Sequence, residues 1–243
     1  MPSDRTDKRP LMKRRQAIWI TLALAGLAGL FVLSAIGDGI YWDTAVPAGK
    51  GLRAALAIRD NVTPFQKWGS EVFTLRYLKR YYGGAWYFTQ SKKGDLEQEI
   101  TSCLDDALEH YLYVDLYLLA HANEYIQWVA RLPEERRRRL RLVYNTGCHN
   151  QTQGPKWLEL GAKAYVGHPG ESWSSVFYYF FLRHWTRRGT VQEAMDASNR
   201  RTETTLKEWE VVTFGHWQAA SLMKGSLASC YGDAQLRLEG QAP

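Results

Sequence analysis

Apolar and polar residues follow two periods along the chain from Leu52 onward. Short apolar blocks alternate with longer segments in which apolar residues recur every three or four positions. Apolar blocks of this kind are typical of buried strands, and the longer period is typical of amphipathic helices. The predicted strands are 52–58, 85–90, 113–120, 140–147, 162–167 and 209–214. The predicted helices include 65–82, 96–107, 124–139, 171–188 and a last one that opens with the capping-box motif Thr190-Val191-Gln192-Glu193.

Strands that alternate with helices predict an α/β fold of three layers, in which a mostly parallel sheet carries helices on both faces. The chain has 243 residues, of which 45% are hydrophobic and 23% are charged. This composition fits one large or two small folded domains and excludes wholesale disorder. Three cysteines are too few for a disulfide framework.

An uncharged apolar run precedes the alternating pattern. It covers 20 residues, 17–36, and a helix of that length spans about 30 Å, the thickness of the hydrocarbon core of a bilayer. We therefore predict a transmembrane helix at 17–37, with a cleaved signal peptide and a buried core helix as the alternatives. The predicted organisation is a basic tail (1–16), this helix, a linker (38–51) and an α/β domain (52–243).

The net charge of +6 is concentrated ahead of the apolar run. Six basic and two acidic residues among the first fifteen contribute +4 of it. An excess of basic residues on one side of a membrane helix predicts that the tail is cytoplasmic and the domain extracytoplasmic, at the cell (inner) membrane. The lipid bilayer is then a partner of residues 17–37. Because the domain itself is nearly neutral, no nucleic-acid partner is expected.

Three reactive side chains follow the ends of successive predicted strands: His121, Cys148 and His168. In an open parallel sheet, ligands bind beyond the carboxyl ends of the strands. If the strands before His121 and Cys148 are neighbours, about 4.8 Å apart, a thiol–imidazole pair can form there. An imidazolium stabilises a thiolate, and the imidazole then serves as general acid for a departing amine.

Three segments carry a resemblance to a known family. Residues 113–123 resemble the strand-and-histidine element of caspase-like cysteine peptidases, and residues 142–148 resemble their strand-and-cysteine element. Residues 157–167 are similar to a strand motif of the CHAT branch, and the whole resemblance covers roughly 52–214. It implies a caspase–hemoglobinase fold with a His121–Cys148 dyad and no cofactor.

The resemblance also implies binding residues around the dyad. An oxyanion hole would use the backbone N–H groups of Ala122 and Cys148, although the family has glycine where this chain has Ala122. The loop after the first strand contributes to the substrate pocket in this family, which places Arg59 and Asp60 there. An inward Arg59 favours an acidic substrate residue and an inward Asp60 a basic one, unless both are solvated or paired with each other. Thr146 and His168 are predicted to line the same pocket.

Other interpretations of the reactive residues stay open. Cys148 and His121 also fit structural roles at strand ends. Together with His149 and His168 they form a possible zinc set, although adjacent residues of a strand point to opposite faces. Cys103 is most simply a core residue, and Cys230 has no evident role.

Three surface features have alternative explanations too. The arginine-rich segment 134–141 is either a processing site or a solvated helix end whose charges match the helix dipole. The aromatic helix 171–188 is mostly core, with a possible partner surface. The motifs that begin at Asn61 and Asn150 match the glycosylation pattern, and we treat both as chance.

Together these patterns predict a membrane-anchored cysteine endopeptidase that acts on a protein or peptide substrate near the membrane. The departure at Ala122 leaves weak activity or an inactive enzyme open. Two competing functions are an inactive caspase-like module that binds peptides or partners, and a structural subunit of a transport or secretion system.

Overall fold

The computed structural model describes residues 18–19, 21–22, 25–26, 29, 48–60, 64–92, 94–119, 124–172, 174–187, 189–212 and 219–239. The chain forms two units, Met1–Ala45 and Val46–Pro243. Described positions of the predicted membrane segment 17–37 are helical, but most of that segment, the tail 1–16 and most of the linker 38–51 lie outside the described residues. No helix among the described residues is both long and apolar enough to cross a bilayer. The anchor thus stays a prediction.

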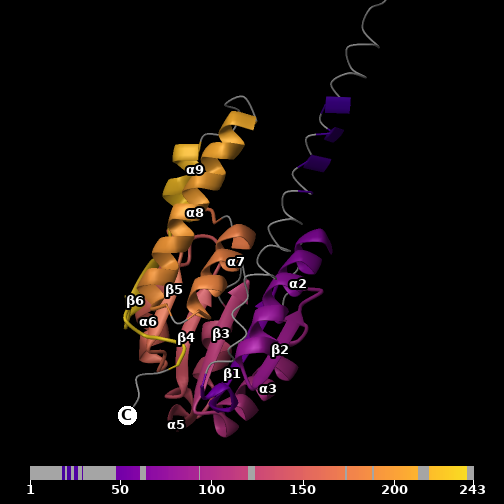
Figure 1. Cartoon of the computed structure of the whole chain (residues 1–243). Helices are drawn as coiled ribbons and strands as arrows, with labels where there is room; N and C mark the ends of the chain where they lie inside the picture. Colours follow the sequence, from indigo (N-terminus) through magenta and orange to yellow (C-terminus); the bar gives the residue numbers. More distant parts are fainter. Residues whose placement is uncertain are drawn as a thin grey trace, which may run out of the picture. The chain divides into compact units, whose positions relative to one another are not determined.

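The second unit is built on a sheet whose described strands run in the order β2-β1-β3-β4-β5-β6 (Figure 1). The strands are β1 (Arg53–Arg59), β2 (Gly84–Thr89), β3 (Tyr113–Leu119), β4 (Leu140–Asn145), β5 (Ala164–Gly167) and β6 (Ser229–Gly232). β1 to β5 pair in parallel, and β6 pairs antiparallel with β5. The predicted α/β class with a mostly parallel sheet is confirmed. The first five strands match their predicted ranges closely.

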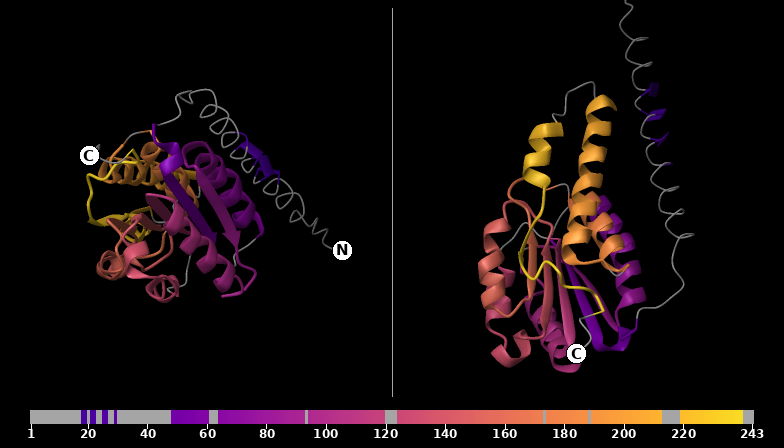
Figure 2. Two further views of the ribbon diagram at one scale, coloured as in Figure 1. Left: turned by 90° about the horizontal axis from the view of Figure 1, so that it is seen from below. Right: turned by 60° about the vertical axis from the view of Figure 1, so that its left-hand side comes forward.

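Helices cover both faces of the sheet (Figure 2). Their bounds are η1 (Lys50–Leu52), α2 (Pro64–Tyr81), α3 (Glu97–His110), α4 (Tyr125–Ala130), α5 (Glu134–Arg137), η2 (Gln151–Gln153), α6 (Gly154–Glu159), α7 (Ser174–Trp185), α8 (Val191–Val212) and α9 (Ala219–Ser226). On one face, Leu104 of α3, Trp128 of α4 and Trp157 of α6 join the hydrophobic core. On the other face, Phe181 of α7 stacks on Tyr144 of β4 with ring centroids 4.5 Å apart.

The predicted sixth strand, 209–214, is wrong. Positions 209–212 belong to α8, and the sixth described strand is Ser229–Gly232. Trp209 and Val211 have strand-forming side chains, but such local preferences are weak, and α8, which packs against α7 and α9, continues through both positions. β6 escapes the hydrophobic pattern because it is only four residues long and ends in a glycine.

The predicted helix 124–139 is divided into α4 and α5. Pro133 stands between them with a ψ of 137°. Proline lacks the N–H that would continue α4, and its ring disfavours helical backbone at the residue before it. The arginines of α5 and the residues after it bind the end of α3: Arg136 pairs with Asp105, and Arg139 donates to the carbonyl oxygens of Leu108 at 3.0 Å and Glu109 at 2.6 Å. The arginine-rich segment 134–141 thus includes a short helix and its end, and the side chains of Arg136 and Arg139 bind the carboxyl end of α3.

The predicted capping box at Thr190 is confirmed. The Thr190 Oγ1 accepts the N–H of Glu193 at 3.0 Å, and the Glu193 Oε2 accepts the N–H of Thr190 at 2.7 Å. The two bonds satisfy backbone donors at the start of α8 that have no partner within the helix.

A buried polar cluster joins the amino ends of the central strands. Asp115 of β3 forms an ion pair with Arg141 of β4, and neither side chain is exposed. The hydroxyl of Tyr82 donates to Asp115 at 2.5 Å. Arg53 and Arg141 both donate to the carbonyl oxygen of Leu238, which holds the C-terminal segment against the sheet. Burial and the neighbouring charge of Arg141 lower the pKa of Arg53.

Candidate active site

The sheet brings the carboxyl ends of β1, β3, β4 and β5 to one edge (Figure 1). Leu118 of β3 is paired in register with Asn145 of β4. His121 follows Leu118 by three positions, and Cys148 follows Asn145 by three positions. The two segments that carry the predicted dyad therefore leave adjacent strands at the same level of the sheet. His121 and Ala122 themselves lie outside the described residues.

Cys148 stands in a short loop that side-chain amides hold in place. The Asn145 Oδ1 accepts the N–H of Gly147 at 3.0 Å. The Asn150 Nδ2 donates to the carbonyl oxygens of Gly147 at 2.7 Å and Asn145 at 3.3 Å. At the start of the loop, the N–H of Thr146 donates to the carbonyl of Leu118 at 2.8 Å. The loop is thus fixed to both β3 and β4.

The thiol of Cys148 is half-buried and has a backbone donor beside it. The N–H of Ser172, just before α7, donates to the Cys148 Sγ at 3.4 Å. This hydrogen bond connects the Cys148 side chain to the segment that leads into α7. The next residue, His149, is exposed, with φ of 52°, and its N–H donates to the carbonyl of Gly170 at 3.0 Å. The segment 170–172 therefore lies directly against the Cys148 loop.

His168, predicted to line the substrate pocket, is fully buried. Its Nδ1 lies 2.8 Å from the carbonyl oxygen of Ser226 at the end of α9. Its N–H donates to the Asn150 Oδ1 at 2.8 Å, and its carbonyl accepts the N–H groups of Asn150 and Gln151 at 3.0 Å. Burial lowers the pKa of the imidazole to about 4, so the ring is neutral at physiological pH. In this structure His168 joins the Cys148 loop to β5 and α9.

Arg59 and Asp60, the predicted specificity residues, are both buried. The Arg59 Nη1 donates to the carbonyl of Leu119 at 3.3 Å, and burial lowers the pKa of the guanidinium. Asp60 accepts the hydroxyl of Tyr125 and the Nε2 of Gln90, the latter at 3.3 Å. Burial and the Asp60 carboxylate raise the pKa of Tyr125. The two predicted residues thus hold Leu119 and Tyr125, which flank positions 120–124 and therefore His121.

Thr146 is buried as well. Besides its N–H, its Oγ1 donates to the carbonyl of Leu118 at 3.3 Å. Its side chain therefore joins the ends of β3 and β4 where the chain turns toward Cys148.

The sequence pattern also offered a zinc set and a glycosylation motif near the carboxyl ends of the strands. Among the described residues, no group of three or more His, Cys, Asp or Glu side chains is placed to hold a metal ion. The suggested zinc set includes His121, which the structure does not describe. Asn150 is 1% exposed, with its amide engaged in the loop, so it is not accessible for glycosylation in the folded domain.

Sequence reasoning missed the residues that support the loop. In the sequence Asn150 stands out only as part of a glycosylation pattern, and nothing there distinguishes Ser172, Gln90 or Tyr125. Their roles depend on contacts between loops that follow different strands. The one signal in the sequence is an asparagine two residues after a reactive cysteine.

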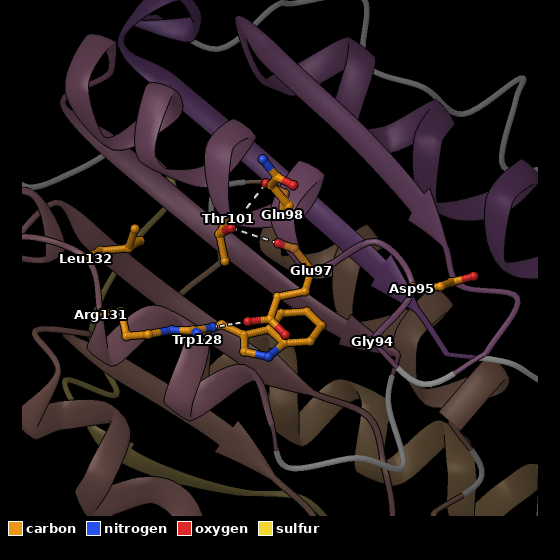
Figure 3. A pocket seen from close by; sticks show the side chains of 8 residues that line it. All are labelled: Gly94, Asp95, Glu97, Gln98, Thr101, Trp128, Arg131 and Leu132. Atoms are coloured by element: carbon orange, nitrogen blue, oxygen red, sulfur yellow. Dashed lines mark hydrogen bonds and ion pairs between the residues drawn. The ribbon is translucent and has the colours of Figure 1, made fainter.

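A separate cavity of about 480 Å³ lies between the first turn of α3 and the end of α4 (Figure 3). Trp128 and Leu132 form part of its wall, and an ion pair between Glu97 and Arg131 crosses it. No predicted site residue lines this cavity. It is therefore distinct from the Cys148 loop.

Comparisons of the chain with protein-family models, with curated proteins and with solved structures found no significant match.

Proposed function

We propose that this protein is a cysteine endopeptidase of caspase-like, CHAT-related type, with Cys148 as nucleophile and His121 as general acid and base. The register of β3 and β4 is the main support. Because Leu118 pairs with Asn145, the segments leading to His121 and Cys148 start side by side. A nucleophile and its base must come within hydrogen-bond reach, and the spacing of about 4.8 Å between adjacent parallel strands supports such a pair in the segments that follow them.

In the proposed reaction, the Cys148 thiolate attacks the carbonyl carbon of a peptide bond and forms a tetrahedral oxyanion. The N–H groups of Cys148 and Ala122 would stabilise this oxyanion. The C–N bond then breaks, and the imidazolium of His121 gives its proton to the departing amine. Water, deprotonated by His121, hydrolyses the resulting thioester and returns the thiol. The net reaction consumes one water and one peptide bond.

The predicted transmembrane helix would confine the enzyme to proteins near the membrane. Cleavage of a membrane-embedded target should then exceed cleavage of the same sequence presented in solution. Equal cleavage of both forms by the full-length chain would contradict this part of the proposal.

Site-resolved alkylation tests the dyad without any substrate. The full chain in detergent is treated with iodoacetamide between pH 5 and 9, and each cysteine is followed by mass spectrometry. Cys103 and Cys230 are internal controls, because burial and nearby carboxylates raise the pKa of each thiol to about 11. We expect Cys148 to react much faster than both near pH 6, and His121→Ala to remove that advantage.

A Cys148 that reacts no faster than Cys103 and Cys230 would remove the main support for a peptidase. The peptide-binding module would then be the better explanation, and Cys148→Ala would leave the biological role intact. If the biological role instead requires residues 17–37 but neither Cys148 nor His121, the protein is a structural subunit.

A further inference from the structure

We infer that Asn150 is a positioning residue that orients the N–H of Cys148 toward the oxyanion. This inference rests on the proposed peptidase function, because it concerns a donor of the proposed oxyanion hole. Asn150 does not touch the reacting atoms in this scheme and acts through the peptide bond between Gly147 and Cys148.

The geometry of that peptide bond connects the two residues. The Asn150 Nδ2 donates to the Gly147 carbonyl oxygen at 2.7 Å. The bond between Gly147 and Cys148 is trans, so the Gly147 C=O and the Cys148 N–H lie in one plane and point in opposite directions. A partner that fixes the carbonyl therefore fixes the direction of the N–H as well.

Asn150 is itself held rigidly, which makes it suitable for this role. Its Oδ1 accepts the N–H of His168 at 2.8 Å, and its own carbonyl accepts the hydroxyl of Tyr165 at 2.8 Å. The side chain is 1% exposed. It thus connects the Cys148 loop to β5, a strand of the sheet, and the peptide plane cannot turn without breaking buried hydrogen bonds.

Gly167 permits this arrangement. A Cβ at position 167 would lie 2.5 Å from the Asn150 Oδ1 and 2.7 Å from the ring of Tyr165. The close approach of the Asn150 carboxamide to β5 therefore requires glycine at this position.

Within the part of the chain that the structure describes, the N–H of Cys148 donates to no backbone or side-chain acceptor. The following N–H, of His149, is instead bound to the carbonyl of Gly170 at 3.0 Å. The peptide planes on both sides of Cys148 are thus fixed, and of these two N–H groups only that of Cys148 has no acceptor among the described residues.

Asn150→Asp tests the inference, because it keeps the acceptor for His168 and replaces the donor to Gly147 with an oxygen that repels the carbonyl. Asn199→Asp is the matched control. The Asn199 carboxamide also bridges backbone groups, donating to the Ala228 carbonyl at 3.2 Å and accepting its N–H at 3.1 Å, but it lies on α8. Asn150→Ser is a milder second variant, too short to reach Gly147, for use if Asn150→Asp does not fold.

Two rates are compared in the full-length protein. Peptide hydrolysis passes through an oxyanion, whereas alkylation of Cys148 by iodoacetamide does not. We expect Asn150→Asp to lower kcat for peptide hydrolysis by about 100-fold or more, the usual effect of losing one oxyanion donor. Alkylation should stay near the wild-type rate, and Asn199→Asp should change neither rate.

Equal losses in both rates would show that Asn150 only keeps the loop folded, and an unchanged kcat would show that it has no role in catalysis. Either result overturns the inference.

If the wild-type protein is alkylated normally but hydrolyses no peptide, the proposed function fails separately. Crystal structures then decide the geometric part: a turned Gly147–Cys148 peptide in Asn150→Asp supports the inference, and an unchanged plane overturns it.

Discussion

Arg141 donates two hydrogen bonds to the carboxylate of Asp115, at 2.9 and 2.6 Å, and neither side chain is exposed. Removing one partner of such a pair leaves a buried charge without compensation. We expect Asp115→Asn to lower the free energy of unfolding by about 3–5 kcal/mol, measured by urea unfolding.

The exposed pair Glu203–Lys207, with an N–O distance of 2.7 Å, is the control. Glu203→Gln should cost about 0.5 kcal/mol or less, since surface pairs one helical turn apart contribute little. Similar losses for the two variants would contradict the importance of burial at Asp115.

The buried His168 predicts a pH-dependent stability. Burial lowers its pKa to about 4 in the folded state, whereas an unfolded histidine titrates near 6.5. Between these values the unfolded state binds more protons, so stability decreases as the pH falls from about 6.5 to about 4. The contribution over this window is about 3 kcal/mol, and it reaches a plateau below pH 4, where the folded state is protonated too.

His168→Gln separates this contribution from that of the carboxylates, which titrate in the same range. The difference in unfolding free energy between wild type and variant should shrink as the pH falls through the window. Parallel curves for the two proteins would mean that His168 titrates normally in the folded state.

The capping box predicts a modest effect on α8. Thr190→Ala removes the acceptor for the Glu193 N–H, and we expect a loss of about 1 kcal/mol in unfolding free energy. Thr204→Ala is the control, because Thr204 is exposed and its Oγ1 only donates back to the Arg200 carbonyl at 3.1 Å. A thermal or urea transition measured for each variant tests this, and equal stabilities of the two would argue against the cap.

Gly154 should not tolerate a side chain. A Cβ there would lie 2.4 Å from the ring of Tyr231, which packs α6 against β6. We expect Gly154→Ala to destabilise the domain by about 1–3 kcal/mol, the typical cost of overpacking. At Gly69 in α2 nothing lies within 4 Å of the added Cβ, so Gly69→Ala should stabilise by about 0.5–1 kcal/mol. Destabilisation of both variants to the same extent, in urea unfolding, would contradict this reading of the packing.

The sheet was largely predictable because its central strands are buried on both faces. All seven residues of β1 are buried, and so are all six of β4, and most of these residues are apolar, as in Ala54–Ile58 and Leu142–Tyr144. Strand β6 has no such pattern, because it lies at the sheet edge with partly exposed residues. The aromatic and branched residues at 209–212 suggested a strand, but they form the end of α8.

In the candidate site, only the residues that directly follow the strand ends were predictable, and the residues that support them were not. Cys148 and His168 could be placed because the ends of parallel strands meet at one edge. The contact of Asn150 with Gly147 lies within one loop, that of Ser172 with Cys148 joins segments 24 residues apart, and no periodic pattern encodes either. Arg59 and Asp60 were expected near a substrate, whereas their observed partners, Leu119 and Tyr125, lie 60 and 65 residues further along the chain.

The Leu238 carbonyl has a consequence for the order in which the domain folds. It accepts hydrogen bonds from Arg53, 185 residues earlier, and from Arg141, 97 residues earlier. Until residue 238 has been synthesised, the guanidinium groups of Arg53 and Arg141, both buried in the folded domain, lack the carbonyl acceptor that they share. The first strands to be synthesised therefore cannot reach their native state one by one, and the domain completes folding as a unit. Contacts of such long sequence separation slow folding, because the chain loses the entropy of closing long loops before these contacts form.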